Sequence, residues 1–84
     1  MIVTARLFAS FRETTGTRSV ELELGGSPTV GDLLTELGRR FPALGPLAER
    51  ALVAVNLEYV GTEFRLSAND EVALIPPVSG GVGA

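Results

Sequence analysis

The residues with the most distinctive chemistry are two consecutive glycines near the end of the chain, Gly80 and Gly81. Glycine has no Cβ atom, so a Gly-Gly segment can enter a narrow channel and present a terminal carboxylate inside another protein. Adenylation of that carboxylate, followed by attack of sulfide, would give a thiocarboxylate, which is a sulfur nucleophile made from the main chain. Taken alone, two glycines favour a frayed terminus over a functional one, because chain ends are commonly unstructured.

The side chains that usually perform catalysis are missing. The sequence contains no cysteine and no histidine, which excludes thiol catalysis, disulfides and nucleophile-histidine pairs. The acidic residues Asp32, Glu36, Asp70 and Glu71 show no metal-ligand spacing, and solvation or capping explains them better. We therefore predict no metal site and no stably bound cofactor.

Charge and hydropathy argue against nucleic acid and membrane as partners. The sequence contains seven arginines and ten acidic residues, which gives a net charge of −3. Apart from the pair Arg39-Arg40 the arginines are scattered, whereas a duplex-binding surface needs clustered positive charge. No run approaches the roughly 20 apolar residues of a membrane helix, and residues 1–9 lack the pattern of a signal peptide. We expect a cytoplasmic protein.

The tail must be positioned by a small folded body, since 84 residues form one domain. Alternation of apolar and polar residues predicts strands over 2–9 and 19–24, paired as a hairpin. Residues 10–16 are expected to connect them, with Gly16 at a positive φ. After the break at 25–28, Thr29 is expected to cap a helix that ends near Arg40, because Pro42 disfavours helical geometry at Phe41.

The second half of the chain predicts short elements. A single helical turn is expected within 44–50, and strands over 52–55 and 59–60 are expected around a tight turn at 56–58. A turn at 67–70 leads into a last strand over 71–75, which Pro76-Pro77 ends because neither proline can donate a ladder hydrogen bond.

This order predicts an α+β fold with a mixed sheet of about five strands packed on one main helix. The long crossover between the hairpin and the last strand suits the first and last strands lying parallel in the middle of the sheet. That arrangement is the β-grasp, the ubiquitin-like fold. We expect a β-grasp domain over 1–76 and a flexible tail over 77–84 that carries Gly-Gly.

Three segments resemble the small subunit of molybdopterin synthase, a MoaD-type sulfur carrier of the MoaD/ThiS ubiquitin-like family. Residues 70–81, DEVALIPPVSGG, resemble its C-terminal signature. Residues 8–13, FASFRE, with Gly16, resemble its first loop, and Val55-Asn56 with residues 58–60, EYV, resemble its middle segment.

The resemblance implies a function in molybdenum cofactor biosynthesis. Gly81 would be adenylated by an E1-like adenylyltransferase that uses ATP, then thiolated, and would donate sulfur to cyclic pyranopterin monophosphate. The large subunit, in a heterotetramer of two small and two large subunits, would hold the catalytic residues. This chain would thus be a sulfur donor rather than a complete enzyme. The resemblance assigns partner binding to these residues: Leu74, Ile75, Pro76, Pro77, Val78, Ser79 and Gly80.

The chain departs from the family pattern at two places. An aromatic residue commonly precedes the diproline, where this chain has Leu74-Ile75, so the partner pocket there would be shaped differently. Family members end at the second glycine, whereas Val82-Gly83-Ala84 follows here and holds the carboxyl of Gly81 in a peptide bond. Three explanations stay open: proteolytic removal of Val82–Ala84, a fusion junction, and an added end. Only a chain whose Gly81 carboxyl is freed could be thiolated there.

Other residues and functions stay open. Leu57 and Tyr59, near a sheet edge, fit a partner-binding patch or ordinary core packing equally well. Arg12 and Glu13 fit a contact with the activating enzyme or a solvated loop pair. The four phenylalanines are expected in the core or in a surface patch. Alternative functions are a sulfur carrier of another pathway, such as thiamine thiazole formation, a ubiquitin-like protein modifier, and an interaction module with an inert tail.

Overall fold

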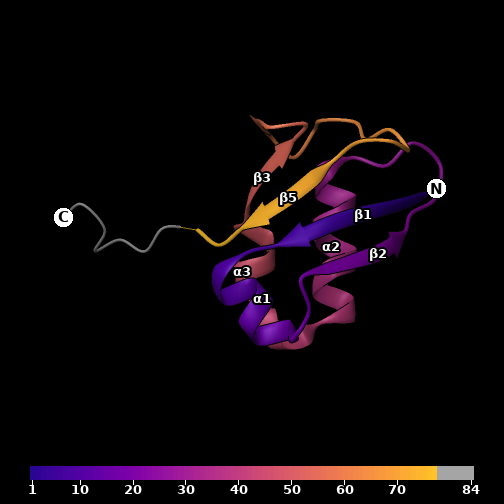
Figure 1. Cartoon of the computed structure of the whole chain (residues 1–84). Coiled ribbons are helices and arrows are strands. Elements are labelled where there is room, and N and C mark those ends of the chain that lie inside the picture. Colours follow the sequence, from indigo (N-terminus) through magenta and orange to yellow (C-terminus); the bar gives the residue numbers. More distant parts are fainter. Residues whose placement is uncertain (78–84) are drawn as a thin grey trace.

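The structure, a computed structural model, describes residues 1–77 and consists of one mixed sheet with helices against it (Figure 1). The strands lie in the order β2-β1-β5-β3-β4, and Figure 1 shows β5 between β1 and β3. The strands are β1 (Ile2–Leu7), β2 (Ser19–Glu23), β3 (Leu52–Val55), β4 (Glu58–Val60) and β5 (Val72–Ile75). The helices are α1 (Ala9–Thr15), α2 (Val30–Arg40), the 3-10 helix η1 (Pro42–Leu44) and α3 (Pro46–Glu49).

The pairing of the strands confirms the predicted β-grasp topology. β1 and β2 form the antiparallel hairpin, with Val3 opposite Leu22. β5 pairs with β1 in parallel and with β3 in antiparallel orientation, so it is paired on both edges. A strand hydrogen-bonded on both sides is held more firmly than an edge strand, and the point where β5 ends is therefore well fixed.

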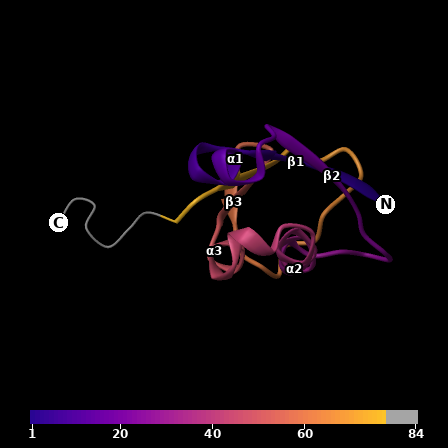
Figure 2. The same ribbon diagram turned by 90° about the horizontal axis from the view of Figure 1, so that it is seen from below.

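One face of the sheet is covered and the other is open. Figure 2 shows α2 and α3 together on one side of the strands. In β1, β2, β3 and β5 every second residue points to that side and is buried, as strand geometry requires, whereas β4 contributes only the partly buried Val60. The buried strand residues are Val3, Ala5, Leu7, Val20, Leu22, Val53, Val55, Val72 and Leu74, and α2 contributes Val30, Leu33, Leu34 and Leu37.

The first turn of α2 is secured by its cap and by the segment that precedes β5. Thr29 and Asp32 form a capping box, in which each side chain accepts from the other's main-chain N–H. The next two free N–H groups, those of Val30 and Gly31, donate to the carbonyl oxygens of Phe64 and Thr62 at 2.9 Å. All the donors that a helix start leaves unpaired are therefore satisfied here.

Residues 10–16 are mostly helical, and the prediction of a simple connection there was wrong. α1 begins at Ala9, buries Phe11 completely and ends at Thr15. Its C-cap is Gly16, whose φ of 76° confirms the predicted left-handed position. The Thr15 hydroxyl donates to the Phe11 carbonyl at 2.9 Å. Burial of one aromatic side chain is what holds this short helix, because isolated helices of this length are unstable in water. None of the helices within residues 1–77 is long and apolar enough to cross a membrane.

Candidate docking surface at the end of β5

The last strand carries the chain from the core to the surface. Val72 and Leu74 point into the core, whereas Ala73 and Ile75 lie half-buried on the open face of the sheet. Pro76 and Pro77 follow, outside the strand. Because proline fixes φ and lacks an N–H donor, the chain leaves the sheet at this point in a defined direction. The described chain thus leaves the sheet at the end of β5, through Pro76 and Pro77.

An apolar surface adjoins this exit. Register places Ala73 of β5 opposite Ala54 of β3, and Ala54 opposite Tyr59 of β4. Ile75 lies opposite Leu52. We call the shallow depression that results the exit patch, and its cavity volume is about 430 Å³. It is lined by Phe8, Ala54, Leu57, Tyr59, Ala73 and Ile75.

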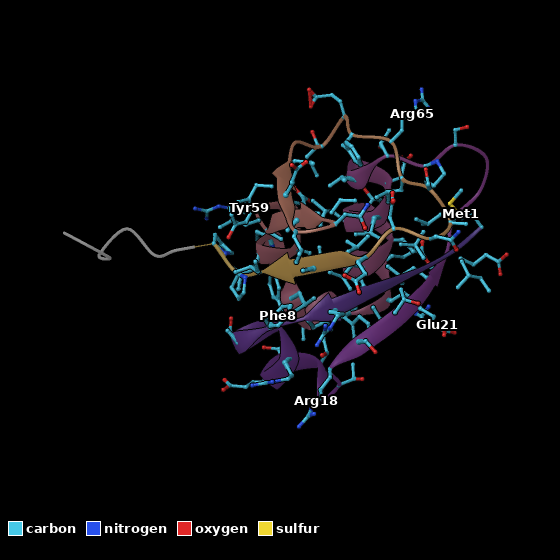
Figure 3. The ribbon with its side chains drawn as sticks, turned by 45° about the horizontal axis from the view of Figure 1, so that its top comes forward. Met1, Phe8, Arg18, Glu21, Tyr59 and Arg65 are labelled. Carbon is cyan, nitrogen blue, oxygen red and sulfur yellow. The ribbon has the colours of Figure 1, made fainter. Side chains whose placement is uncertain are left out.

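Two aromatic side chains flank the exit. In Figure 3, Phe8 and Tyr59 lie on either side of the arrowhead of β5. Tyr59 is 71% exposed and Phe8 is 37% exposed. The main-chain N–H of Phe8 donates to the carbonyl of Leu74 at 3.3 Å, which ties the end of β1 to the end of β5. Exposed aromatic residues around a shallow apolar surface are typical of protein-protein contacts.

The turn between β3 and β4 holds Leu57 in solvent. Asn56 and Leu57 both have positive φ, 53° and 73°, a conformation that costs energy for leucine. The Asn56 amide donates to Asp70 and accepts from the N–H of Glu71, both at 3.0 Å, and its own N–H donates to the Glu71 carbonyl at 2.8 Å. These bonds fix a turn whose leucine is 91% exposed. The Leu57 side chain therefore adds little to the core and is available to a partner.

The titratable groups with shifted pKa values lie elsewhere. The hydrogen bond from Arg39 lowers the pKa of Glu36 and raises the pKa of Arg39, and both residues are on α2, which covers the other face of the sheet. Residues 1–77 hold no cluster of acidic side chains suited to a metal ion. Within this part of the chain the exit patch offers apolar contact rather than acid-base or metal chemistry.

The sequence-predicted site residues divide into three groups. Leu74 is completely buried, so its side chain is not available to a partner, contrary to the expectation. Ile75, Pro76 and Pro77 are half-buried at the exit. The remaining ones, Val78, Ser79, Gly80 and Gly81, lie outside the described residues, and their roles stay predictions.

The patch residues were only partly foreseen. The structure favours the surface-patch alternative for Leu57 and Tyr59 over core packing. Phe8, Ala54 and Ala73 were not assigned to this surface, although strand alternation puts Ala54 and Ala73 on the face opposite to the core. Phe11 is in the core, Phe41 packs against it, and Phe64 is partly exposed.

Fold and site together define a ubiquitin-like β-grasp protein whose last strand ends beside an apolar surface. The chain belongs to the ThiS family, whose profile matches residues 5–81. It is 37% identical to a molybdopterin synthase sulfur carrier subunit of Dictyostelium discoideum, covering 89% of this chain and 91% of that protein.

Archaeal proteins are similar as well. Small archaeal modifier protein 1 of Haloferax volcanii is 39% identical, with 90% of this chain and 97% of that protein covered. A crystal structure of SAMP1 from the same organism superimposes with a TM-score of 0.82 at 35% identity, covering 96% of this chain and all of the other. The chain is thus similar both to proteins named as sulfur carrier subunits and to proteins named as modifiers.

Proposed function

We propose that this protein is the sulfur carrier subunit of a molybdopterin synthase and donates sulfur from a thiocarboxylate at Gly81 to cyclic pyranopterin monophosphate. The proposal is supported by family membership and by relatives named as sulfur carrier subunits at 37–40% identity. The observation that carries it is the exit patch, which lies beside the strand that leads into the Gly-Gly segment. A carrier needs such a surface because it delivers its terminus into another protein.

The chemistry needs a free carboxyl at Gly81, so removal of Val82–Ala84 is part of the proposal. The carboxylate attacks ATP on an E1-like adenylyltransferase, which releases pyrophosphate and forms an acyl adenylate. Sulfide then displaces AMP and leaves the thiocarboxylate. Its sulfur attacks a side-chain carbon of the pterin and displaces the oxygen that this carbon carries, which leaves Gly81 joined to the pterin through a thioester. Hydrolysis of the acyl–sulfur bond then returns the Gly81 carboxylate and leaves the sulfur on the pterin. The chain itself supplies Gly81 and no catalytic side chain.

The proposed partner of the loaded carrier is the large subunit of the synthase. Ile75, Pro76 and Pro77 would lie at the mouth of its channel, and Val78, Ser79 and Gly80 would line the path to the reacting carboxyl. The exit patch would seat the body of the carrier on the surface around that mouth. ATP would be consumed by the activating enzyme rather than bound stably by this chain.

A protein modifier is the second candidate, favoured by the likeness to small archaeal modifier protein 1. The sequence contains no lysine, and the one amine, at Met1, donates to the Leu24 carbonyl at 2.9 Å. Such a modifier would attach to other proteins as single copies, because it offers no free side-chain amine for a second copy.

The intact mass of the protein purified from its own cells separates the two functions. A carrier is expected as a chain that ends at Gly81, with a fraction in which one oxygen is replaced by sulfur. A modifier is expected in stable conjugates of higher mass that disappear in a Gly81→Ala variant. A chain that always retains Val82–Ala84, in cells that make molybdopterin, would contradict the proposal.

A further inference from the structure

One basic side chain borders the exit patch. Arg6 of β1 lies on the open face, opposite Ala73 in the parallel register. A second depression, of about 90 Å³, is lined by Arg6, Glu71 and several residues of the exit patch. The guanidinium carbon of Arg6 is 5.7 Å from the centre of the Phe8 ring, which is within the range of a cation–π contact. The charge is therefore held toward the patch.

Arg6 has no acidic partner within residues 1–77. The only ion pair in that part of the chain joins Arg39 to Glu36, and Arg6 makes no side-chain hydrogen bond there. Glu71 lines the same small depression, but it comes directly before Val72, which pairs with Ala5. It therefore lies toward Thr4, on the side of Arg6 away from Phe8. The guanidinium leans toward the aromatic ring instead of pairing with Glu71.

We propose that Arg6 binds a carboxylate of the protein that covers the exit patch. The partner surface is thus apolar and carries one Asp or Glu directed at Arg6. A guanidinium that is covered without an acceptor loses its hydration uncompensated, so a partner that seals the patch must supply one. The planar fork of arginine matches a carboxylate with two parallel hydrogen bonds, which a single main-chain carbonyl cannot provide.

The position of Phe8 makes this pairing favourable. Contact with the ring restricts the arginine side chain before the partner arrives, and this lowers the entropy lost on binding. The carboxylate of Glu71 repels a partner acid placed near Thr4, so the partner's acid is expected on the Phe8 side of Arg6. Arg6 then selects both the partner and its orientation.

Calorimetric titration with the large subunit from the same organism tests the inference, which rests on the proposed function for the choice of that partner. The full chain is compared with Arg6→Ala, Arg6→Glu and Arg6→Lys. The control is Arg18→Glu, which makes the same charge change at an exposed arginine. Register places Arg18 next to Leu7 rather than Arg6, and Figure 3 shows it pointing away from the molecule.

We expect Arg6→Ala to weaken binding about tenfold, Arg6→Glu to weaken it further, and Arg6→Lys to fall between wild type and alanine. Arg18→Glu is expected to stay within about twofold of wild type. The difference between wild type and Arg6→Ala should shrink as salt is raised. Charge reversal of the partner's acid should restore binding to Arg6→Glu.

The outcomes separate the inference from the function on which it rests. If the wild-type chain binds and Arg6→Glu binds equally well, or Arg18→Glu is equally impaired, the role of Arg6 is wrong while the carrier function stands. If the wild-type chain does not bind the large subunit at all, the proposed function is contradicted together with this choice of partner. Arg6 is exposed, so each variant is expected to keep the fold. Circular dichroism of each variant checks this.

Discussion

Leu74 and Ile75 are neighbours on β5 but lie on opposite sides of the sheet. Leu74 faces the core and is 0% exposed, whereas Ile75 faces the exit patch. Strand geometry makes this alternation unavoidable, because successive side chains point to opposite faces. Of these two adjacent residues of similar size, Leu74 thus serves the core, whereas the side chain of Ile75 is available to a partner.

Alanine substitutions at these two positions should separate the tasks. Leu74→Ala is expected to lower the free energy of unfolding by about 2–5 kcal/mol, because it opens a cavity in the core. Ile75→Ala is expected to cost about 1 kcal/mol or less in stability but to weaken binding of the large subunit about fivefold to tenfold. Urea denaturation and calorimetry measure the two effects. A stable Leu74→Ala variant would contradict the assignment.

Leu57 should contribute to binding without contributing to folding. Leu57→Asp is expected to change the free energy of unfolding by less than about 0.5 kcal/mol, since the side chain is 91% exposed and aspartate tolerates positive φ. Binding of the large subunit should fall more than about tenfold. The matched control is Leu47→Asp, which places the same change on α3, on the helical face. Equal loss of binding in both variants would argue against the exit patch.

The capping box at Thr29 should be worth a measurable part of the stability. Thr29→Ala removes the acceptor for the Asp32 N–H and is expected to cost about 1 kcal/mol, whereas Thr29→Ser keeps an acceptor and should cost much less. Thr62→Ala is the control, because the Thr62 hydroxyl bonds only the exposed Glu63 side chain among the described residues. Urea midpoints that do not differ between Thr29→Ala and Thr29→Ser would show that the cap is unimportant.

The Glu36–Arg39 pair should depend on pH in a defined direction. The hydrogen bond from Arg39 lowers the pKa of Glu36 in the folded protein. Its contribution to stability is therefore fully present above the unfolded pKa of glutamate and is lost as pH falls through the lower, folded pKa. Because the pair is at the surface, the effect on stability is small. In an NMR titration of the Glu36 carboxyl carbon, Arg39→Gln should raise the midpoint, and an unchanged midpoint would exclude the pairing.

The sequence predicted the elements in which apolar residues recur at regular spacing. The hairpin, α2 and β5 show repeated apolar spacing, and the structure confirms them. α1 was not predicted, because only one of its seven residues, Phe11, is buried. A single apolar side chain has no periodicity, so the helix depends on a tertiary contact that local sequence does not reveal.

The candidate site was likewise predicted only in part, because some of its features depend on tertiary contacts. Leu57 and Tyr59 were foreseen as one of two alternatives, since apolar residues at a sheet edge can be buried or exposed. Their meeting with Phe8 depends on the parallel pairing of β1 with β5, which joins opposite ends of the chain. Leu74 was assigned to the partner contact from its place in a signature, and only the strand register shows that its side chain points the other way.

Sulfur transfer itself is tested most directly by molybdopterin formation in a single turnover. The chain ending at a Gly81 thiocarboxylate, purified large subunit and cyclic pyranopterin monophosphate are combined, and the same chain with a Gly81 carboxylate serves as the control. We expect dithiolene product in proportion to the thiocarboxylate added and none from the carboxylate. Failure of the thiocarboxylate chain to form product, with a large subunit that is active toward its own established carrier, would contradict the account.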